Sequence, residues 1–224
     1  MKRNSHVIRK KIIHIFTIWA GLFIISAPAE AGFQLGVGLG QANTKADLGG
    51  TDNTYSGFYA STAMRFSFEL PSLATIALGG VFDGYSLDKK TGSGQNTGLM
   101  SFMNLGIDAV AYIELLHFGP VRPFVHFSVS KSVYANAIVD YTYVETTGSY
   151  SYTAYYSRQK LSGTFQQIGG GLAFEIMPLY HLFAEYMIMS GRVQVTDVPA
   201  ALQSTIKDFS LSGSRWTLGL ILGF

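Results

Sequence analysis

The C-terminal ten residues show a strict two-residue alternation of hydrophobic and other side chains. One face carries Phe224, Leu222, Leu220, Leu218 and Trp216, and the other carries Gly223, Ile221, Gly219, Thr217 and Arg215. Residues two apart point to the same side of a strand, so the pattern predicts a β-strand. Its apolar outer face spans about 20 Å along the membrane normal at a typical tilt, close to the ~25 Å apolar band of membrane barrels. We therefore predict that this strand faces lipid.

Seven further segments alternate in the same way. They are residues 34–40, 58–70, 75–83, 103–115, 123–130, 167–176 and 182–188. Turns are expected at Pro71, Pro120 and Pro178, and long polar loops at Gln41–Ser56, Ser86–Thr97, Asp140–Gly163 and Ser190–Lys207. Membrane barrels have short periplasmic turns and long extracellular loops. The pattern thus predicts an all-β fold, an eight-stranded antiparallel transmembrane up-and-down β-barrel with periplasmic termini and extracellular loops.

The N-terminus has the features of an export signal. Five basic residues occur among the first eleven, and the apolar run Ile12–Ile25 and the small-residue sequence Ala29-Glu30-Ala31 follow. This order predicts a secretory signal peptide over residues 1–31, cleaved between Ala31 and Gly32, and a barrel over residues 32–224. An uncleaved anchor is the alternative, but about fifteen residues is short for a spanning helix, which needs roughly 20.

Composition narrows the function classes. The formal net charge of the whole chain is +2, but residues 32–224 keep 11 basic and 13 acidic residues, a net charge of −2. The basic excess therefore belongs to the leader, and we expect no nucleic-acid partner. The chain has no cysteine, which excludes disulfides and thiolate metal sites.

Two sets of short motifs resemble known outer-membrane proteins. The ending Thr217-x-Gly219-x-x-Leu222-x-Phe224 resembles the C-terminal signal that the barrel-assembly machinery recognises. Phe68-Glu-Leu, Ile113-Glu-Leu and Phe174-Glu-Ile each precede a predicted turn, and the whole of residues 32–224 resembles the small OmpA/opacity-type barrel family. This resemblance implies a bacterial outer-membrane location and contact with outer-membrane lipid or lipopolysaccharide. It does not imply one role, because the family includes adhesins, resistance factors and minor porins.

Candidate catalytic groups are few. His126-x-Ser128 resembles the His-x-Ser pair of outer-membrane lipid A deacylases, but Val129 follows where those enzymes have Asn, and the pair is expected to face the lumen. His117 and His181 fall in predicted turns without metal-ligand spacing. We expect no catalytic residue, no metal and no cofactor.

Ionisable residues are predicted on the lumen face. Arg65, Asp108, His126 and Glu185 are expected at half height. Rings are expected above them, with Asp83 and Arg215, and below them, with Glu69, Glu114, Arg122 and Glu175. An eight-stranded barrel is just wide enough for side chains to fill, so the charges should pair as a plug, with Arg65 facing two carboxylates and His126 adding positive charge.

The third predicted loop is rich in tyrosine, with Tyr141, Tyr143, Tyr150, Tyr152, Tyr155 and Tyr156. Alternation around Thr146-Thr-Gly148 predicts a hairpin ribbon, and tyrosine favours binding surfaces. An interfacial aromatic girdle is the alternative. The preferred hypothesis is a non-enzymatic surface barrel for envelope structure and loop-mediated adhesion to an extracellular or host ligand. A narrow channel for small or hydrophobic solutes and a lipid A-modifying enzyme are the alternatives.

Overall fold

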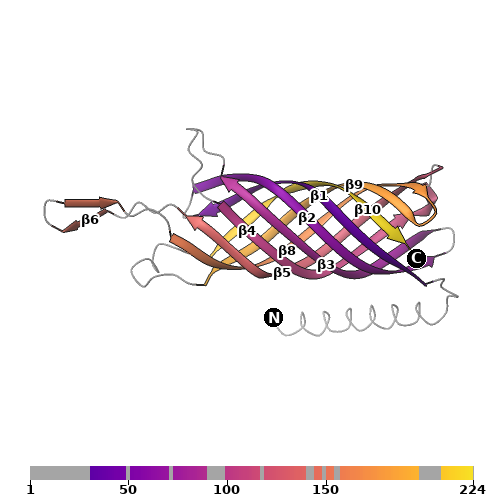
Figure 1. Ribbon diagram of the computed structural model, residues 1–224, viewed down its shortest axis with the longest axis horizontal. Coiled ribbons are helices and arrows are strands. Elements are labelled where there is room, and N and C mark those ends of the chain that lie inside the picture. The colour runs from indigo at the N-terminus through magenta and orange to yellow at the C-terminus, as the bar shows by residue number, and fades with distance from the viewer. Residues whose placement is uncertain are drawn as a thin grey trace, which may run out of the picture.

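The protein is a closed antiparallel β-barrel. The computed structural model describes residues 31–48, 51–70, 73–89, 99–116, 119–139, 144–147, 150–153, 157–196 and 208–223. Eight of the strands in these ranges close in the order β1-β10-β9-β8-β5-β4-β3-β2 (Figure 1). The predicted fold class, an all-β eight-stranded antiparallel barrel, is confirmed.

The barrel strands are long. Their bounds are β1 Ala31–Leu48, β2 Thr51–Leu70, β3 Ala74–Lys89, β4 Leu99–Ile113, β5 Val121–Val139, β8 Ser157–Met177, β9 Tyr180–Val195 and β10 Phe209–Gly223. A short 3-10 helix, η1, spans Glu114–Leu116, so Glu114 does not extend the fourth strand as expected. Its carboxylate instead accepts a hydrogen bond of 3.0 Å from the Thr75 hydroxyl.

The two ends of the barrel differ. At one end, here called the turn end, short connections join β2 to β3, β4 to β5 and β8 to β9, and β1 starts and β10 finishes there. Gly119 and Leu179 adopt positive φ values of 59° and 76° in two of these turns. The Gly223 amide donates to the Leu179 carbonyl at 2.8 Å, which ties the end of β10 to a turn. The opposite end is called the loop end.

The predicted inward and outward faces are confirmed. On β2, Tyr59 and Arg65 are buried, whereas Met64 and Phe66 are 59% and 60% exposed on the outside. Among the described residues, no helix has both the length and the apolar character needed to cross a membrane.

The predicted long loops were wrong in extent. β1 continues to Leu48 and β2 begins at Thr51, so most of Gln41–Ser56 is strand. β3 likewise continues to Lys89, β8 begins at Ser157 and β9 continues to Val195. These stretches are rich in polar residues and also alternate with a two-residue period. Here, however, the polar residues face outward and the apolar residues face inward. The strands therefore extend beyond the segments with an apolar outer face.

The predicted hairpin in the third loop is present. β6 (Val144–Thr147) and β7 (Tyr150–Thr153) pair antiparallel and form a two-stranded sheet separate from the barrel. Figure 1 shows this hairpin beyond the end of the barrel opposite the C-terminus. We call it the ribbon.

Candidate functional site: the barrel lumen and its outer surface

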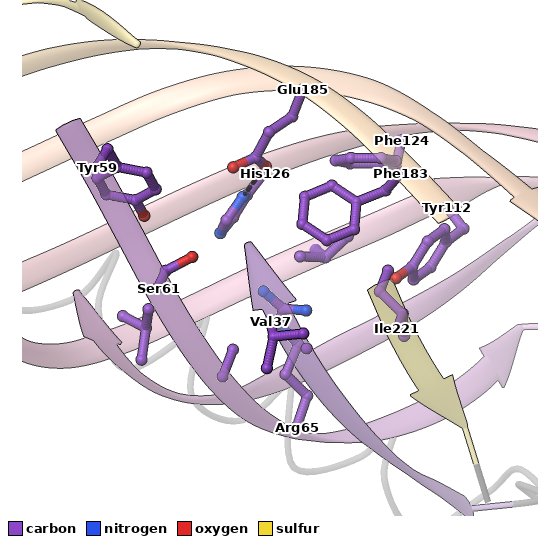
Figure 2. Close-up of a pocket in the computed structure, with 14 residues that line it drawn as sticks. Val37, Tyr59, Ser61, Arg65, Tyr112, Phe124, His126, Phe183, Glu185 and Ile221 are labelled. Atoms are coloured by element: carbon purple, nitrogen blue, oxygen red, sulfur yellow. Dashed lines mark hydrogen bonds and ion pairs between the residues drawn. The ribbon is translucent and has the colours of Figure 1, made fainter. Parts of the chain in front are cut away.

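A chain of ion pairs crosses the middle of the lumen. Arg65 Nη2 lies 2.6 Å from Asp108 Oδ2, and His126 Nε2 lies 3.4 Å from the same oxygen. His126 Nδ1 lies 2.8 Å from Glu185 Oε2, a contact drawn as a dashed line in Figure 2. Arg215 Nη1 lies 2.5 Å from Glu185 Oε1. We call these five side chains, from β2, β4, β5, β9 and β10, the central cluster.

The structure brings together the four residues predicted at half height, but it adds Arg215. This residue was expected in a separate ring above, and the contact of its side chain with Glu185 was not predicted. Arg65 pairs with Asp108, whereas Glu185 pairs with Arg215 and His126. Counting from the turns does not give relative height, because the strands of a closed barrel are staggered by its shear. The cluster thus has two arginines for its two carboxylates.

Neutral polar side chains extend the cluster toward the loop end. Arg215 Nε donates to Gln167 Oε1 at 2.7 Å, and its guanidinium lies 4.0 Å from the centre of the Tyr59 ring. Gln167 and Asn104 both donate to Asp83, at 3.3 and 2.6 Å. Asn104 and Gln167 were not predicted as partners, although both are polar residues on predicted inward faces.

An apolar layer fills the loop-end part of the lumen. It contains sixteen buried residues, among them Leu87, Phe102, Phe165 and Leu211. Phe165 is fully buried, and a Cβ added at Gly191 would lie 2.4 Å from its ring. Glycine at that inward position therefore leaves room for the aromatic side chain. Most of this layer was not predicted, because its residues fall in the predicted loops or between those loops and the predicted strands, where the continued alternation was the available signal.

A second apolar layer closes the lumen toward the turn end. Val110, Tyr112, Phe124 and Ile221 are buried there, and Phe183 packs against them. Figure 2 shows Tyr112, Phe124, Phe183 and Ile221 with Arg65, His126 and Glu185, which line a cavity of about 20 Å³. Such a cavity has room for about one water molecule.

The charges predicted below the cluster lie at the turn end. Arg122 lies 4.0 Å from Glu114 and 3.8 Å from Glu175, in half-exposed pairs. Glu69 is exposed near the end of β2. These residues form a solvated rim that the turn-end apolar layer separates from the central cluster.

The outer surface changes polarity along each strand in the opposite sense to the lumen. On β10, the outward residue is apolar at Leu218, which is 57% exposed, and polar at Ser212, nearer the loop end. The inward residue changes from the polar Thr217 to the apolar Leu211, both 1% exposed. β10 therefore has an apolar outside and a polar inside around Thr217, in the middle of the strand, and the reverse near its loop end.

The same inversion occurs on β8. Outward Ile168 is 61% exposed and inward Gln167 is buried, whereas closer to the loop end Thr164 is exposed and Phe165 is buried. We call the part of the barrel with the apolar outer surface the band, and the loop-end part with the polar outer surface the collar.

The remaining predicted residues fall in several places. In the assembly motif, Thr217 accepts a hydrogen bond from Arg215, and a Cβ on Gly219 would lie 2.4 Å from the Phe183 ring, so both positions also pack the lumen. Leu222 pairs with Leu35 on β1. Phe224 lies outside the described residues.

The tyrosine-rich loop and the leader are described only in part. Tyr150 and Tyr152 lie on β7, whereas Tyr141, Tyr143, Tyr155 and Tyr156 lie outside the described residues. At the predicted cleavage site, Ala31 begins β1 and Gly32 pairs with Ser67. The leader up to residue 30 lies outside the described part, so cleavage stays a prediction.

The candidate catalytic pair lies inside the barrel. His126 and Ser128 are 5% and 2% exposed on the inward face of β5, and His126 is engaged by Glu185. Within the described ranges, no group of three or more His, Asp or Glu side chains is arranged to hold a metal ion.

Comparisons with known proteins return structural similarity alone. No protein-family profile and no curated protein matches the chain. The chain is similar in structure to outer membrane protein OprG from Pseudomonas aeruginosa, with 10% identity, a TM-score of 0.47 and coverage of 88% of this chain and 97% of that one. A major outer membrane protein from Thermus thermophilus is 15% identical, with a TM-score of 0.48 and coverage of 87% of this chain and 99% of that one. Neisserial surface protein A is 15% identical, with a TM-score of 0.43 and coverage of 85% of this chain and 97% of that one. The chain thus resembles small outer-membrane barrels in structure only, and this likeness carries nothing about ligand or activity.

Proposed function

We propose that the protein is a sealed, non-enzymatic outer-membrane barrel that displays its ribbon outside the cell for interaction with an extracellular or host ligand. The observation that carries this proposal is the inverted polarity of the band and the collar. An apolar outside with a polar inside suits a wall in lipid, and the reverse suits a wall in water. The same strands would therefore serve both environments.

The height of the band supports placement in a bilayer. On β9 the outward positions are apolar over nine residues, from Tyr180 to Ile188, with Leu182 and Tyr186 at least half exposed between them. Nine strand residues span about 23 Å along the barrel axis at a typical tilt. An outer-membrane barrel has an apolar band of about 25 Å. The collar would then project from the membrane on the side of the ribbon.

The packing of the lumen favours a sealed barrel over a channel. A permeating ion would have to pass the loop-end layer, the central cluster and the turn-end layer. Both apolar layers consist of buried side chains, and the cluster between them is held by ion pairs as short as 2.5 Å. The narrow-channel alternative would require these contacts to open.

The same packing weighs against catalysis. An esterase or deacylase needs its nucleophile within reach of lipid, and Ser128 points into the lumen, paired in register with Asp108 and Gln167 of neighbouring strands. Its neighbour His126 lies between two carboxylates of the central cluster. We therefore keep the lipid A-modifying enzyme as the less favoured alternative.

Chymotrypsin treatment of intact cells tests the display of the ribbon, because this protease cleaves after tyrosine. The expected result is cleavage within residues 140–156, giving two fragments that remain associated. The control replaces residues 140–156 with Asn-Gly, a two-residue hairpin turn, between Val139 and Ser157, which are already paired. Cleavage of the wild type only after the cells are broken would contradict the orientation. A large, steady wild-type conductance in planar bilayers would instead favour the channel.

A further inference from the structure

Three basic side chains lie on the outer surface near the loop-end edge of the band. Lys45 on β1, Lys131 on β5 and Arg192 on β9 are all exposed, and each has an inward-facing neighbour in sequence that is buried. Within the described residues, none of the three has an ion-pair partner. We call them the basic belt.

Strand register places the belt on one side of the barrel. Lys131 pairs with Thr164 on β8, and Thr164 pairs with Arg192. Arg192 pairs with Ser210 on β10, two residues from Ser212, which pairs with Lys45. The three charges thus lie on alternate strands, about 10 Å apart at the usual strand spacing, with hydroxyl side chains between them.

Toward the loop end of β2, β3 and β4, no described residue combines a basic side chain with an exposed, outward position. There β2, β3 and β4 present outward Thr54, Ser86 and Ser101, and the exposed charge of β3 at this end is Asp88. General attraction to a charged membrane surface would not require this asymmetry. A one-sided cluster of cations is instead expected of a site for a particular anionic molecule.

The backbone of the belt lies close to the outer edge of the headgroup layer. Arg192 lies four residues above outward Ile188, which is 59% exposed in the band. Four strand residues correspond to about 10 Å along the axis at a typical tilt, and the polar layer of a bilayer is about 5–8 Å thick on each side. Lysine and arginine side chains near the membrane edge extend toward the headgroups.

The band has a hollow in its lipid-facing surface, which adjoins the belt at its Lys45 end. The outward residues Leu39, Phe58, Phe82, Trp216 and Leu218 surround it on β1, β2, β3 and β10. In the cross-strand row through Leu39, the next two outward positions are Ala60 and Gly84, which are too small to fill it. The hollow shares β1 with Lys45 and is almost wholly apolar, as an acyl chain requires.

We propose that this face binds one lipid with phosphate groups in its headgroup, from the leaflet at the loop end. The phosphates contact the basic belt and an acyl chain lies in the hollow. The site rests on the proposed membrane placement. Charge complementarity determines the headgroup, and the apolar hollow determines that the anion is part of a lipid rather than a free phosphate.

Binding of diphosphoryl lipid A to the mature protein in phosphatidylcholine nanodiscs tests the site. Native mass spectrometry would measure lipid occupancy for the wild type and for K45Q, K131Q and R192Q. Each variant should bind about fivefold more weakly, the usual contribution of one basic residue at an anionic membrane surface. A60F, which fills the hollow without changing charge, should also weaken binding.

R122Q is the control, because Arg122 lies in the solvated rim at the turn end, at the opposite end of the barrel from the belt. Its binding should equal that of the wild type. Equal binding by R192Q and R122Q would overturn the proposal, and so would displacement of the lipid by inorganic pyrophosphate at equal concentration. Heat-modifiable gel mobility reports insertion separately, so failure of the barrel to insert would overturn the membrane placement itself.

Discussion

Neutralising Glu185 should destabilise the barrel strongly. The Glu185→Gln variant keeps the shape of the side chain but removes the charge that lies 2.5 Å from Arg215. Arg215 is 2% exposed, so water cannot replace the lost carboxylate. Breaking a buried ion pair by removing one partner costs about 3–5 kcal/mol. Arg215 keeps its contacts with Gln167 and Tyr59, so we expect a loss near the lower value, about 3 kcal/mol.

The matching Arg215→Met change completes a double-mutant cycle. Alone it should cost a similar amount, because it leaves Glu185 with His126 as its remaining ion-pair partner, and only if the imidazole is protonated. Replacing both partners of a buried pair is often close to neutral, so Glu185→Gln with Arg215→Met should lose less than the sum of the single changes. The expected coupling is about 2 kcal/mol.

Urea unfolding in phosphatidylcholine vesicles would measure these free energies, with tryptophan fluorescence and gel mobility as independent probes. Ser212→Ala, on the exposed face of the same strand, is the control and should change stability by less than about 0.5 kcal/mol. Full stability of the Glu185→Gln variant, or strict additivity in the cycle, would refute the reasoning. Either result would mean that water screens the central cluster and that the lumen is not sealed.

Three further predictions concern single positions. Leu218→Arg should destabilise the inserted barrel by about 2–4 kcal/mol, because Leu218 lies in the band. Ser212→Arg should cost about 0–1 kcal/mol, because Ser212 lies in the collar. Equal losses of stability in urea unfolding would contradict the boundary between band and collar. Leu179→Gly should gain about 0.5 kcal/mol in the same assay, since glycine adopts the observed φ of 76° without strain, although it also loosens the unfolded chain. Deleting Phe224 should lower the heat-modifiable fraction in outer membranes while periplasmic protein persists, and an unchanged fraction would argue against an assembly signal.

The sequence predicted the band well because lipid makes the alternation unambiguous. The outward and inward faces of β2 and β10 follow directly from it, as Phe66 and Arg65 illustrate. The collar was predicted poorly, because the sequence was searched for strands with an apolar outer face. A strand with water outside and packed side chains inside lacks that face and resembles a polar loop. Ala42 and Ala46, both fully buried, belong to stretches that were expected to be loops.

The central cluster was predicted in its members but not in its pairing. Alternate residues of a strand point to the same side, so the inward position of Arg65, Asp108, His126 and Glu185 could be predicted. Pairing depends on the stagger between strands, which local pattern does not contain. Arg215 was therefore assigned to a separate ring, and its contact with Glu185 was not predicted, because Arg215 pairs in register with Met187 and reaches Glu185 through its long side chain.

The inversion of inside and outside polarity along β8 and β10 also disfavours errors of strand register during assembly. A slip of one residue in pairing moves every side chain to the opposite face. On β10, such a slip would turn Arg215 toward hydrocarbon and, at the same time, Leu211 toward water. A misregistered barrel would thus be penalised in both solvents at once, and no shift along the membrane normal could relieve both errors. The correct register is specified twice, by two environments that demand opposite patterns.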